Sequence, residues 1–298
     1  MMEIRIGELA ALTTAFCWTI TAMSFETASR RVGSVAVNII RLVMAFILLG
    51  LFSWINRGMF FPVDASIHSW QWLILSGLIG FVIGDLFLFE AFTLVGSRLS
   101  MLIMTLVPPI TATLGWLLMA EQMSWLNILG MAMTISGIAI VIFKRKTVKG
   151  EVIRYPAKGL FFAFLGAVGQ AGGYVLSKYG MGEYDPFAAT QIRVMAGIFG
   201  FTIVVSFFKR WMAVKKALNQ RKPMLLMLLG ATFGPFIGVS MSLLAAQHTT
   251  TGIASTIMAI TPILIIPPTV IIFKQKVTLK EIVGACISVT GVSLFFLF

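Results

Sequence analysis

Long apolar runs alternate along the whole chain with short segments rich in charged or turn-forming residues. Each run is about 20 residues long, the length that an α-helix needs to cross a hydrocarbon core about 30 Å thick. Such runs favour helices over barrel strands, which would be about ten residues long and strictly alternating. The pattern predicts an all-α membrane protein with ten transmembrane helices, at roughly residues 7–29, 34–56, 70–92, 97–119, 125–143, 157–179, 187–208, 223–247, 251–273 and 279–298.

Composition strengthens this prediction. The chain is 58% hydrophobic and 11% charged, with a mean hydropathy of +0.96, whereas soluble domains are about half apolar and a quarter charged. Cys17 and Cys286 lie in apolar runs near opposite ends, so they predict neither a disulfide framework nor a cysteine metal site. The opening MMEIRIGE lacks the basic start of a removable signal peptide, and none is expected.

The formal net charge of +12 is distributed unevenly. Of the 23 lysines and arginines, 18 fall in loops that follow odd-numbered predicted helices, and Arg5, Arg57 and Lys178 fall on the opposite side. The positive-inside rule places the odd-to-even loops in the cytoplasm and both termini outside, in a cell inner membrane. Because that rule accounts for the charge, nucleic acid is not an expected partner.

The sequence also repeats itself at an offset of 152 to 154 residues. Arg41 matches Arg193, and matched glycines and prolines recur from one end of the chain to the other. The interpretation is two five-helix repeats, at residues 1–150 and 151–298. Since five is odd, the second repeat enters the membrane from the opposite side, and inverted repeats of this kind carry substrate sites near the midplane. The matched pairs are Gly7 with Gly159, Gly77 with Gly230, Gly84 with Gly238, Ala91 with Ala245, Pro108 with Pro262, Gly130 with Gly284, and Gly137 with Gly291.

Two stretches of the first repeat, FCWTITAMSFETASRRVGSVAVNIIRLVMAF and LVPPITATLGWLLMAEQMSWLNILGMAMTISGIAIVIF, resemble the repeat of the EamA-like family in the drug/metabolite transporter (DMT) superfamily. They share a Trp in the first helix, an Arg in the second, a Pro in the fourth, and then a Glu and a glycine-rich fifth helix. The second repeat keeps the Arg, the Pro and the run IVGACISVTGVSLFF, but has Gln170 in place of Trp18 and Gln275 in place of Glu121.

The resemblance covers essentially the whole chain and implies a transporter of amino acids, sugars or other small metabolites. It implies a central cavity lined by predicted helices 1, 3, 4, 6, 8 and 9, with helices 5 and 10 peripheral. Mapped onto this sequence, the candidate substrate-binding residues are Trp18, Thr21, Phe81, Asp85, Thr105, Gln170, Tyr174, Met241 and Met258.

Asp85 is the acidic residue deepest in an apolar run, FVIGDLFLF. A carboxylate is costly to hold within a bilayer, so such a residue indicates a functional site. Two readings stay open: Asp85 faces a cavity and binds a proton or a substrate ammonium group, or it pairs with an arginine for structural reasons. The second repeat carries Val239 at the equivalent position, so this feature breaks the symmetry.

Arg41 and Arg193 lie at similar depths within predicted helices 2 and 7, in opposite leaflets. One interpretation is that each side chain reaches the nearer membrane surface or pairs with a carboxylate and holds helix ends in register. The other is that they are mirrored parts of two gates, each closed by an ion pair. Glu90 is expected to form a salt bridge at the membrane surface, near Glu26 and Arg98.

Pro108 and Pro262 form a matched pair within predicted helices 4 and 9. Proline lacks an N–H group and frees a carbonyl about four residues earlier, so both positions predict a kink that acts as a hinge or stays fixed. Small residues recur on predicted helices 1 and 6 at spacings of three and four, which favours close helix packing. On helix 6 these are Gly166, Gly169, Gly173 and Ser177.

Enzyme motifs are absent from the sequence: the only histidines are His68 and His248, and neither GxSxG nor GxxxxGK occurs. The prediction is therefore no enzyme, no cofactor and no metal, but a secondary transporter that works by alternating access. It is expected to export amino acids or related compounds, with proton coupling through Asp85 as an open question, as a monomer or homodimer whose partners are a small-molecule substrate and the lipid bilayer. The alternatives are an uptake carrier for a sugar or sugar-like solute and, outside transport, a membrane-embedded lipid enzyme or an assembly factor.

Overall fold

The computed structural model describes residues 2–119, 125–142, 146–148, 151–153, 155–248, 254, 257–274 and 277–297. Apart from one short hairpin, every regular element in these residues is helical. The first half contains α1 (Met2–Val32), α2 (Ser34–Arg57), α3 (Ile67–Gly77), η1 (Leu78–Gly84), α4 (Asp85–Val95), α5 (Ser97–Ile103), η2 (Met104–Leu106), α6 (Val107–Met119) and α7 (Trp125–Ile142). The second contains α8 (Ala157–Met181), α9 (Pro186–Phe207), α10 (Trp211–Leu218), α11 (Arg221–Ala231), η3 (Thr232–Gly238), α12 (Val239–His248), α14 (Thr261–Leu264), α15 (Ile266–Phe273) and α16 (Leu279–Leu297).

Four of the predicted helices contain irregular turns near their middles. Predicted helices 3 and 8 each contain a π-helical turn, η1 and η3, and Pro235 lies inside η3. Predicted helix 4 tightens into the 3-10 turn η2 just before Pro108, and predicted helix 9 is divided into α14 and α15. Because π turns shift the hydrogen-bond ladder and prolines interrupt it, regular α-helical geometry is broken inside the protein at these turns.

The two halves share the positions of these elements as well as residues. Helix α3, turn η1 and the start of α4 match α11, η3 and the start of α12 at an offset of 154 residues, and α7 and α16 begin at the same offset. The two π turns therefore occupy equivalent positions in the two halves.

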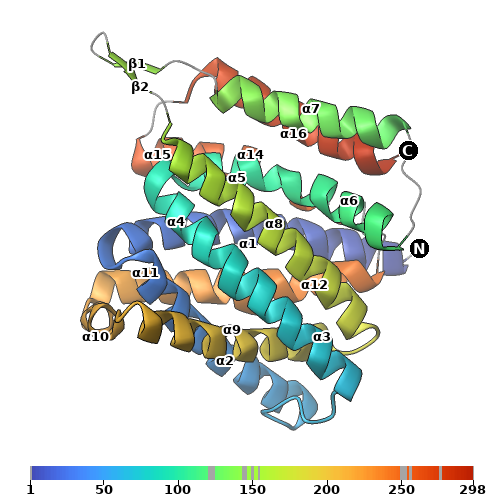
Figure 1. The fold of residues 1–298 in the computed structure, drawn as a ribbon. Coiled ribbons are helices and arrows are strands. Elements are labelled where there is room, and N and C mark those ends of the chain that lie inside the picture. The colour runs from blue at the N-terminus through green and yellow to red at the C-terminus, as the bar shows by residue number, and fades with distance from the viewer. Residues whose placement is uncertain are drawn as a thin grey trace.

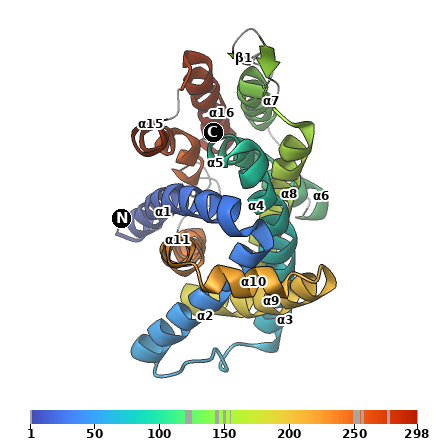
Figure 2. The same ribbon diagram turned by 90° about the vertical axis from the view of Figure 1, so that its left-hand side faces the viewer.

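Helices α7 and α16 pack against each other along one edge of the molecule (Figures 1 and 2). The Thr134 hydroxyl donates to the Ser288 carbonyl at 3.3 Å, and the Ser288 hydroxyl donates to the Thr134 carbonyl at 3.2 Å. The surrounding close contacts join Gly137 to Gly284 and Gly130 to Gly291. Each contact is matched by one between equivalent residues, which is the pattern of an approximate two-fold axis between antiparallel helices.

Among the described residues, seven helical stretches are long and apolar enough to cross a membrane. They coincide with predicted helices 1 to 4 and 6 to 8, and the shorter apolar helices Ile128–Ile142 and Thr261–Ile272 coincide with predicted helices 5 and 9. Large apolar side chains such as Ile55, Phe207 and Ile271 are exposed, as expected for a protein that faces lipid. The chain is thus a multi-pass membrane protein, whereas the count of ten helices stays a prediction.

The two ends of the helix bundle differ in character. Both chain termini lie at one end, and the strands β1 (Lys146–Val148) and β2 (Glu151–Ile153) lie with α10 at the other (Figure 1). The sequence interpretation treated the hairpin and α10 as loops. Helix α10 forms next to basic residues and exposes Trp211 and Met212, which suits the interface between lipid and water.

A central cavity as candidate functional site

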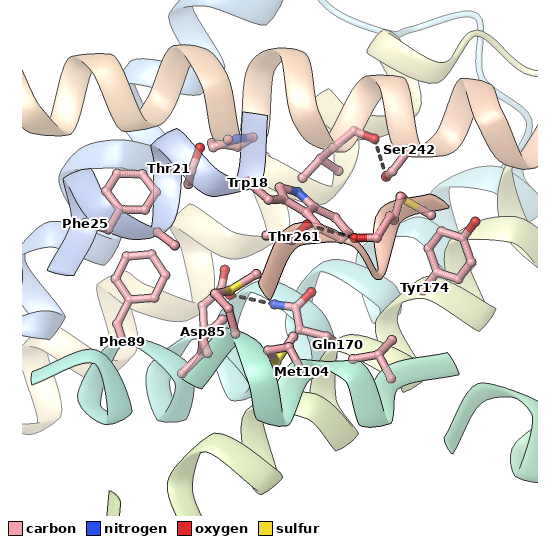
Figure 3. Close-up of a pocket in the computed structure, with 18 of the residues that line it drawn as sticks. Trp18, Thr21, Phe25, Asp85, Phe89, Met104, Gln170, Tyr174, Ser242 and Thr261 are labelled. Carbon is pink, nitrogen blue, oxygen red and sulfur yellow. Dashed lines mark hydrogen bonds between the residues drawn. The ribbon is translucent and has the colours of Figure 1, made fainter. Parts of the chain in front are cut away.

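A cavity of about 150 Å³ lies at the centre of the bundle. Most of its wall is formed by α1, α4, α8 and α12 together with the broken segments η1, η2, η3 and α14, and α2, α5, α6 and α9 add single residues or pairs, so both halves contribute (Figure 3). Eight of the nine predicted binding residues line it: Trp18, Thr21, Phe81, Asp85, Thr105, Gln170, Tyr174 and Met258. Met241 does not line it; the neighbouring Ser242 does, and Met241 instead packs in an apolar cluster with Met258 and Tyr174.

Asp85 lies at the junction between η1 and α4, with only 4% of its surface exposed. Its carboxylate forms an ion pair with Arg41, and the Gln170 side chain donates to its Oδ1 at 2.6 Å (Figure 3). Arg41 in turn donates through Nε to the Asn38 side-chain carbonyl at 3.0 Å, and Asn38 Nδ2 donates to the Asp85 carbonyl at 3.3 Å. The network therefore ties α2, α4 and α8 together around a buried carboxylate.

Asn38 was not among the predicted site residues. A signal was present, because Asn38 precedes Arg41 by three residues in the same apolar run, and residues three apart share one helix face. An amide beside a buried guanidinium can satisfy one of its donors, as Asn38 does for Arg41.

Both arginines line the cavity instead of reaching the membrane surface, and Arg41 is 3% and Arg193 4% exposed. Their guanidinium groups lie over the same Phe81 ring, 5.8 Å away for Arg41 and 4.7 Å away for Arg193. Cation–π contacts of this length stabilise a positive charge in apolar surroundings. The ion pair with Asp85 holds the Arg41 side chain inward, and the Phe81 ring is the contact that Arg193 shares with it.

The model of the EamA-like transporter family matches the chain twice, at residues 5–143 and 157–297. The chain belongs to the EamA-like transporter family. The transporter also resembles a crystal structure of a protein with 16% sequence identity and a TM-score of 0.63, over 98% of this chain and 96% of that one, which shows a shared fold. No curated protein matches the chain.

The family match covers both halves of the transporter, in agreement with the resemblance to the DMT superfamily read from the sequence. Glu121 and Gln275, one of the pairs in which the two repeats differ, lie outside the described residues. Among the described residues, no group of three or more His, Cys, Asp or Glu side chains is placed to hold a metal ion.

A second cavity, of about 210 Å³, adjoins the central one, and Pro262 lines both. Glu26 accepts a hydrogen bond from the Ser97 backbone N–H at 2.8 Å and forms an ion pair with Arg30 at 3.0 Å. Arg98 pairs with Glu281 at 3.5 Å, so these contacts connect α1, α5 and α16.

Glu90 is arranged differently from the salt bridge expected for it. It accepts a hydrogen bond from the Ser34 hydroxyl at 2.7 Å, and the ion pairs between described residues do not include it. Ser34 begins α2, so this hydrogen bond links that end of α2 to α4.

The opposite end of the transporter is held by a cluster in the loops after α2 and α8. Arg57 forms an ion pair with Asp64, and Tyr184 donates to Asp64 at 2.8 Å. Burial raises the pKa of Tyr184 to about 12, so the hydroxyl stays protonated and keeps donating at neutral pH. Gln247 at the end of α12 donates to the Tyr184 carbonyl at 2.9 Å, which fastens the second half to this cluster.

Proposed function

We propose that this transporter is a secondary carrier that moves a small amphipathic metabolite through the central cavity by alternating access. The observation that carries the proposal is the cavity itself, which lies where broken helices of both halves meet and is lined by three buried charged side chains. In transporters built from inverted repeats, substrates bind at the repeat interface beside discontinuous helices.

The proposed halves are residues 1–150 and 151–298, inserted in opposite directions as two five-helix repeats. The matched π turns support this division, as do the self-complementary contacts of α7 with α16, since an antiparallel two-fold pair of spanning helices requires opposite insertion. The concentration of basic residues supports a cytoplasmic location for the end that carries α10 and the hairpin, with both termini outside.

The cavity wall favours a cargo with a flat or branched apolar part and few polar groups. Trp18, Phe25, Phe81, Phe89 and Phe92 supply most of its aromatic surface, and Met101, Met104 and Met258 add flexible side chains that adapt to shape. Amino acids with apolar side chains, or related compounds, exported from the cell, are the first candidate class. A sugar is the second, because the indole of Trp18 offers a face on which a sugar ring stacks.

Energy coupling would come from an ion gradient or from exchange. Asp85 is the proposed proton site, and because it is bonded to Arg41 and Gln170, protonation would release both partners together. Pro108 and Pro262, which line the cavity in equivalent positions, are the proposed hinges. The ion pairs of Glu26 and Arg98 are proposed to close the cytoplasmic exit, and opening would require breaking them.

Counterflow in proteoliposomes tests the proposal. Vesicles loaded with pools of unlabelled amino acids should take up a labelled member of the matching pool, and Trp18→Ala should reduce the initial rate at least tenfold. The matched control is Trp125→Ala, because Trp125 lies on α7 away from the cavity and is 74% exposed. Absence of exchange with every amino-acid and sugar pool, or equal losses in both variants, would contradict a carrier that works through this cavity.

A further inference from the structure

The buried arginines of the two halves differ in their ion-pair partners. Arg41 has the carboxylate of Asp85 as its ion-pair partner. Arg193 is the equivalent arginine, but the residue equivalent to Asp85 is Val239, which also lines the cavity. Among the described residues, no ion pair or side-chain hydrogen bond involves the Arg193 guanidinium, and its buried Nε has no hydrogen-bond partner.

The charges on the cavity wall therefore do not cancel. Two arginines and one aspartate line it, which leaves one positive charge in excess. The Phe81 ring compensates Arg193 only in part, since a ring quadrupole is weaker than a counter-ion. A buried cation without a paired anion is strongly disfavoured.

A second unsatisfied donor faces the same region. The Tyr174 hydroxyl is buried without a hydrogen-bond partner among the described residues, and Tyr174 lines the cavity from α8 (Figure 3), as Arg193 does from α9. A guanidinium and a phenol hydroxyl together present several N–H and O–H groups to one ligand. Paired oxygens of a planar anion are the groups that match a guanidinium best.

We infer that Arg193 and Tyr174 bind the carboxylate of the transported solute, while the Arg41–Asp85–Gln170 network remains internal to the protein. The excess of one charge favours a monocarboxylate over a phosphate monoester, which carries close to two charges at neutral pH. The apolar part of the solute would lie against Trp18 and Phe81. This inference rests on the proposed function and narrows its substrate to small monocarboxylates, amino acids included.

Ligand-induced thermal stabilisation of the purified full-length protein provides the test. The probes are aromatic and branched aliphatic monocarboxylates, including 3-phenylpropionate and phenylalanine, each paired with its primary amide. At least one carboxylate should raise the melting temperature, and its amide should bind at least tenfold more weakly. Stabilisation by amides alone, equal binding of acid and amide, or binding of no member of the panel would overturn the inference.

Two variants separate charge recognition from general damage. Val239→Asp supplies the counter-ion that the second half lacks, so it should lower carboxylate affinity at least tenfold while leaving the unliganded melting temperature unchanged or raised. Arg193→Gln removes the excess charge, so this variant should bind acid and amide equally. It provides the test of charge recognition if Val239→Asp fails to fold. Glu90→Gln, away from the cavity, should behave like the wild type.

Two results would show that only one of the two proposals, the carboxylate site or the carrier, is wrong. Counterflow of neutral solutes without any effect of Val239→Asp or Arg193→Gln would keep the carrier and reject the carboxylate site. Carboxylate binding that depends on Arg193, without exchange of any labelled solute, would support the site and reject the carrier.

Discussion

Helix α8 crosses α3, η1 and α4 in the same way that α1 crosses α11, η3 and α12, yet the two crossings are built from residues of different size. In the α8 crossing, backbone meets backbone: Gly169 lies on Gly84, and Gly173 lies on Gly80. A methyl group placed on Gly169 would come within 2.5 Å of the Gly84 Cα, so no side chain fits between these helices. The stripe of small residues on predicted helix 6 forms this contact.

The equivalent α1 crossing has side chains at the same places. Cys17 faces Gly238, Thr21 faces Gly234 and Phe25 faces Gly230. These three α1 residues correspond to Gly169, Gly173 and Ser177 of α8, at an offset of 152 residues. In the α1 crossing, α11 and η3 keep their glycines, but α1 carries larger side chains where α8 has small residues. Helix α1 is therefore held by side chains that can change rotamer.

The polar contacts differ in the same sense. At the α8 crossing, Gln170 donates to Asp85, whereas the equivalent positions at the α1 crossing are occupied by Trp18 and Val239. The α8 crossing is therefore fastened by backbone contact and by the hydrogen bonds of Ser76 and Gln170. The α1 crossing is formed mainly by side-chain packing, with one hydrogen bond between described residues, from the Thr14 hydroxyl to the Gly238 carbonyl at 3.2 Å. The proposed alternating access needs one interface that yields, and the α1 crossing is the one whose contacts cost less to rearrange.

Loss of the Asp85 charge should give the largest difference in unfolding free energy between matched variants of the two crossings. Asp85→Asn leaves Arg41 and Arg193 buried without a carboxylate, and removing one partner of a buried ion pair costs about 3–5 kcal/mol. Val239→Ala at the equivalent position of the α1 crossing removes only part of an apolar side chain and should cost about 1 kcal/mol. Denaturant unfolding of both variants in the same detergent measures the difference, and equal losses would show that the two crossings are equally fastened.

Exchange of equivalent residues between the two crossings should give an intermediate difference in stability. Gly173→Thr places a branched side chain against the Gly80 backbone, whose Cα would lie 2.7 Å from the new Cβ, so overpacking should cost about 3 kcal/mol. The reverse exchange, Thr21→Gly, introduces no clash and should cost less than about 1 kcal/mol, because Thr and Gly differ by only about 0.3 kcal/mol in helix propensity. Melting temperatures of the two variants would test this, and a larger loss for Thr21→Gly would reverse the assignment of the rigid crossing.

Much of this fold could be predicted from the sequence because bilayer thickness fixes the length of apolar runs and because glycines and prolines mark equivalent positions. The family assignment read from the Trp18, Arg41 and Pro108 pattern is confirmed by the family model. Eight of nine predicted binding residues lie on the cavity wall, since all six helices that the resemblance identified contribute to it; predicted helices 2 and 7, which it did not include, add Arg41 and Arg193. Met241 missed the wall because a neighbouring position on a helix points about 100° away.

Other features depended on packing that one sequence does not encode. Asp85 and Arg41 are 44 residues apart, and sequence alone left open whether the acid binds a proton or a substrate ammonium group in a cavity or pairs with an arginine. The structure pairs Asp85 with Arg41 and places it on the cavity wall, and its binding of a proton or an ammonium group stays a prediction. The turn η1 contains no proline, so the π turn beneath Asp85 gave no local signal. The arginines were expected in opposite leaflets, but long side chains let both reach the Phe81 ring.

A single hydroxyl offers the finest measure of how tightly the α8 crossing is held. Ser76 donates to the Gly173 carbonyl at 2.6 Å and is bonded to the Ser177 hydroxyl at 2.7 Å. At the offset of 154 residues that aligns α3 with α11, the position of Ser76 is occupied in the α1 crossing by Gly230, which the sequence comparison had paired with Gly77. Ser76→Ala removes both bonds without adding volume and should cost about 1 kcal/mol. Ser136→Ala is the matched control, because Ser136 is exposed on α7 and donates only within its own helix, to the Ala132 carbonyl at 2.7 Å. Hydrogen exchange of α8 amides should quicken in Ser76→Ala and stay unchanged in Ser136→Ala. If α8 exchanged at the wild-type rate in both variants, glycine packing alone would account for the rigidity of this crossing.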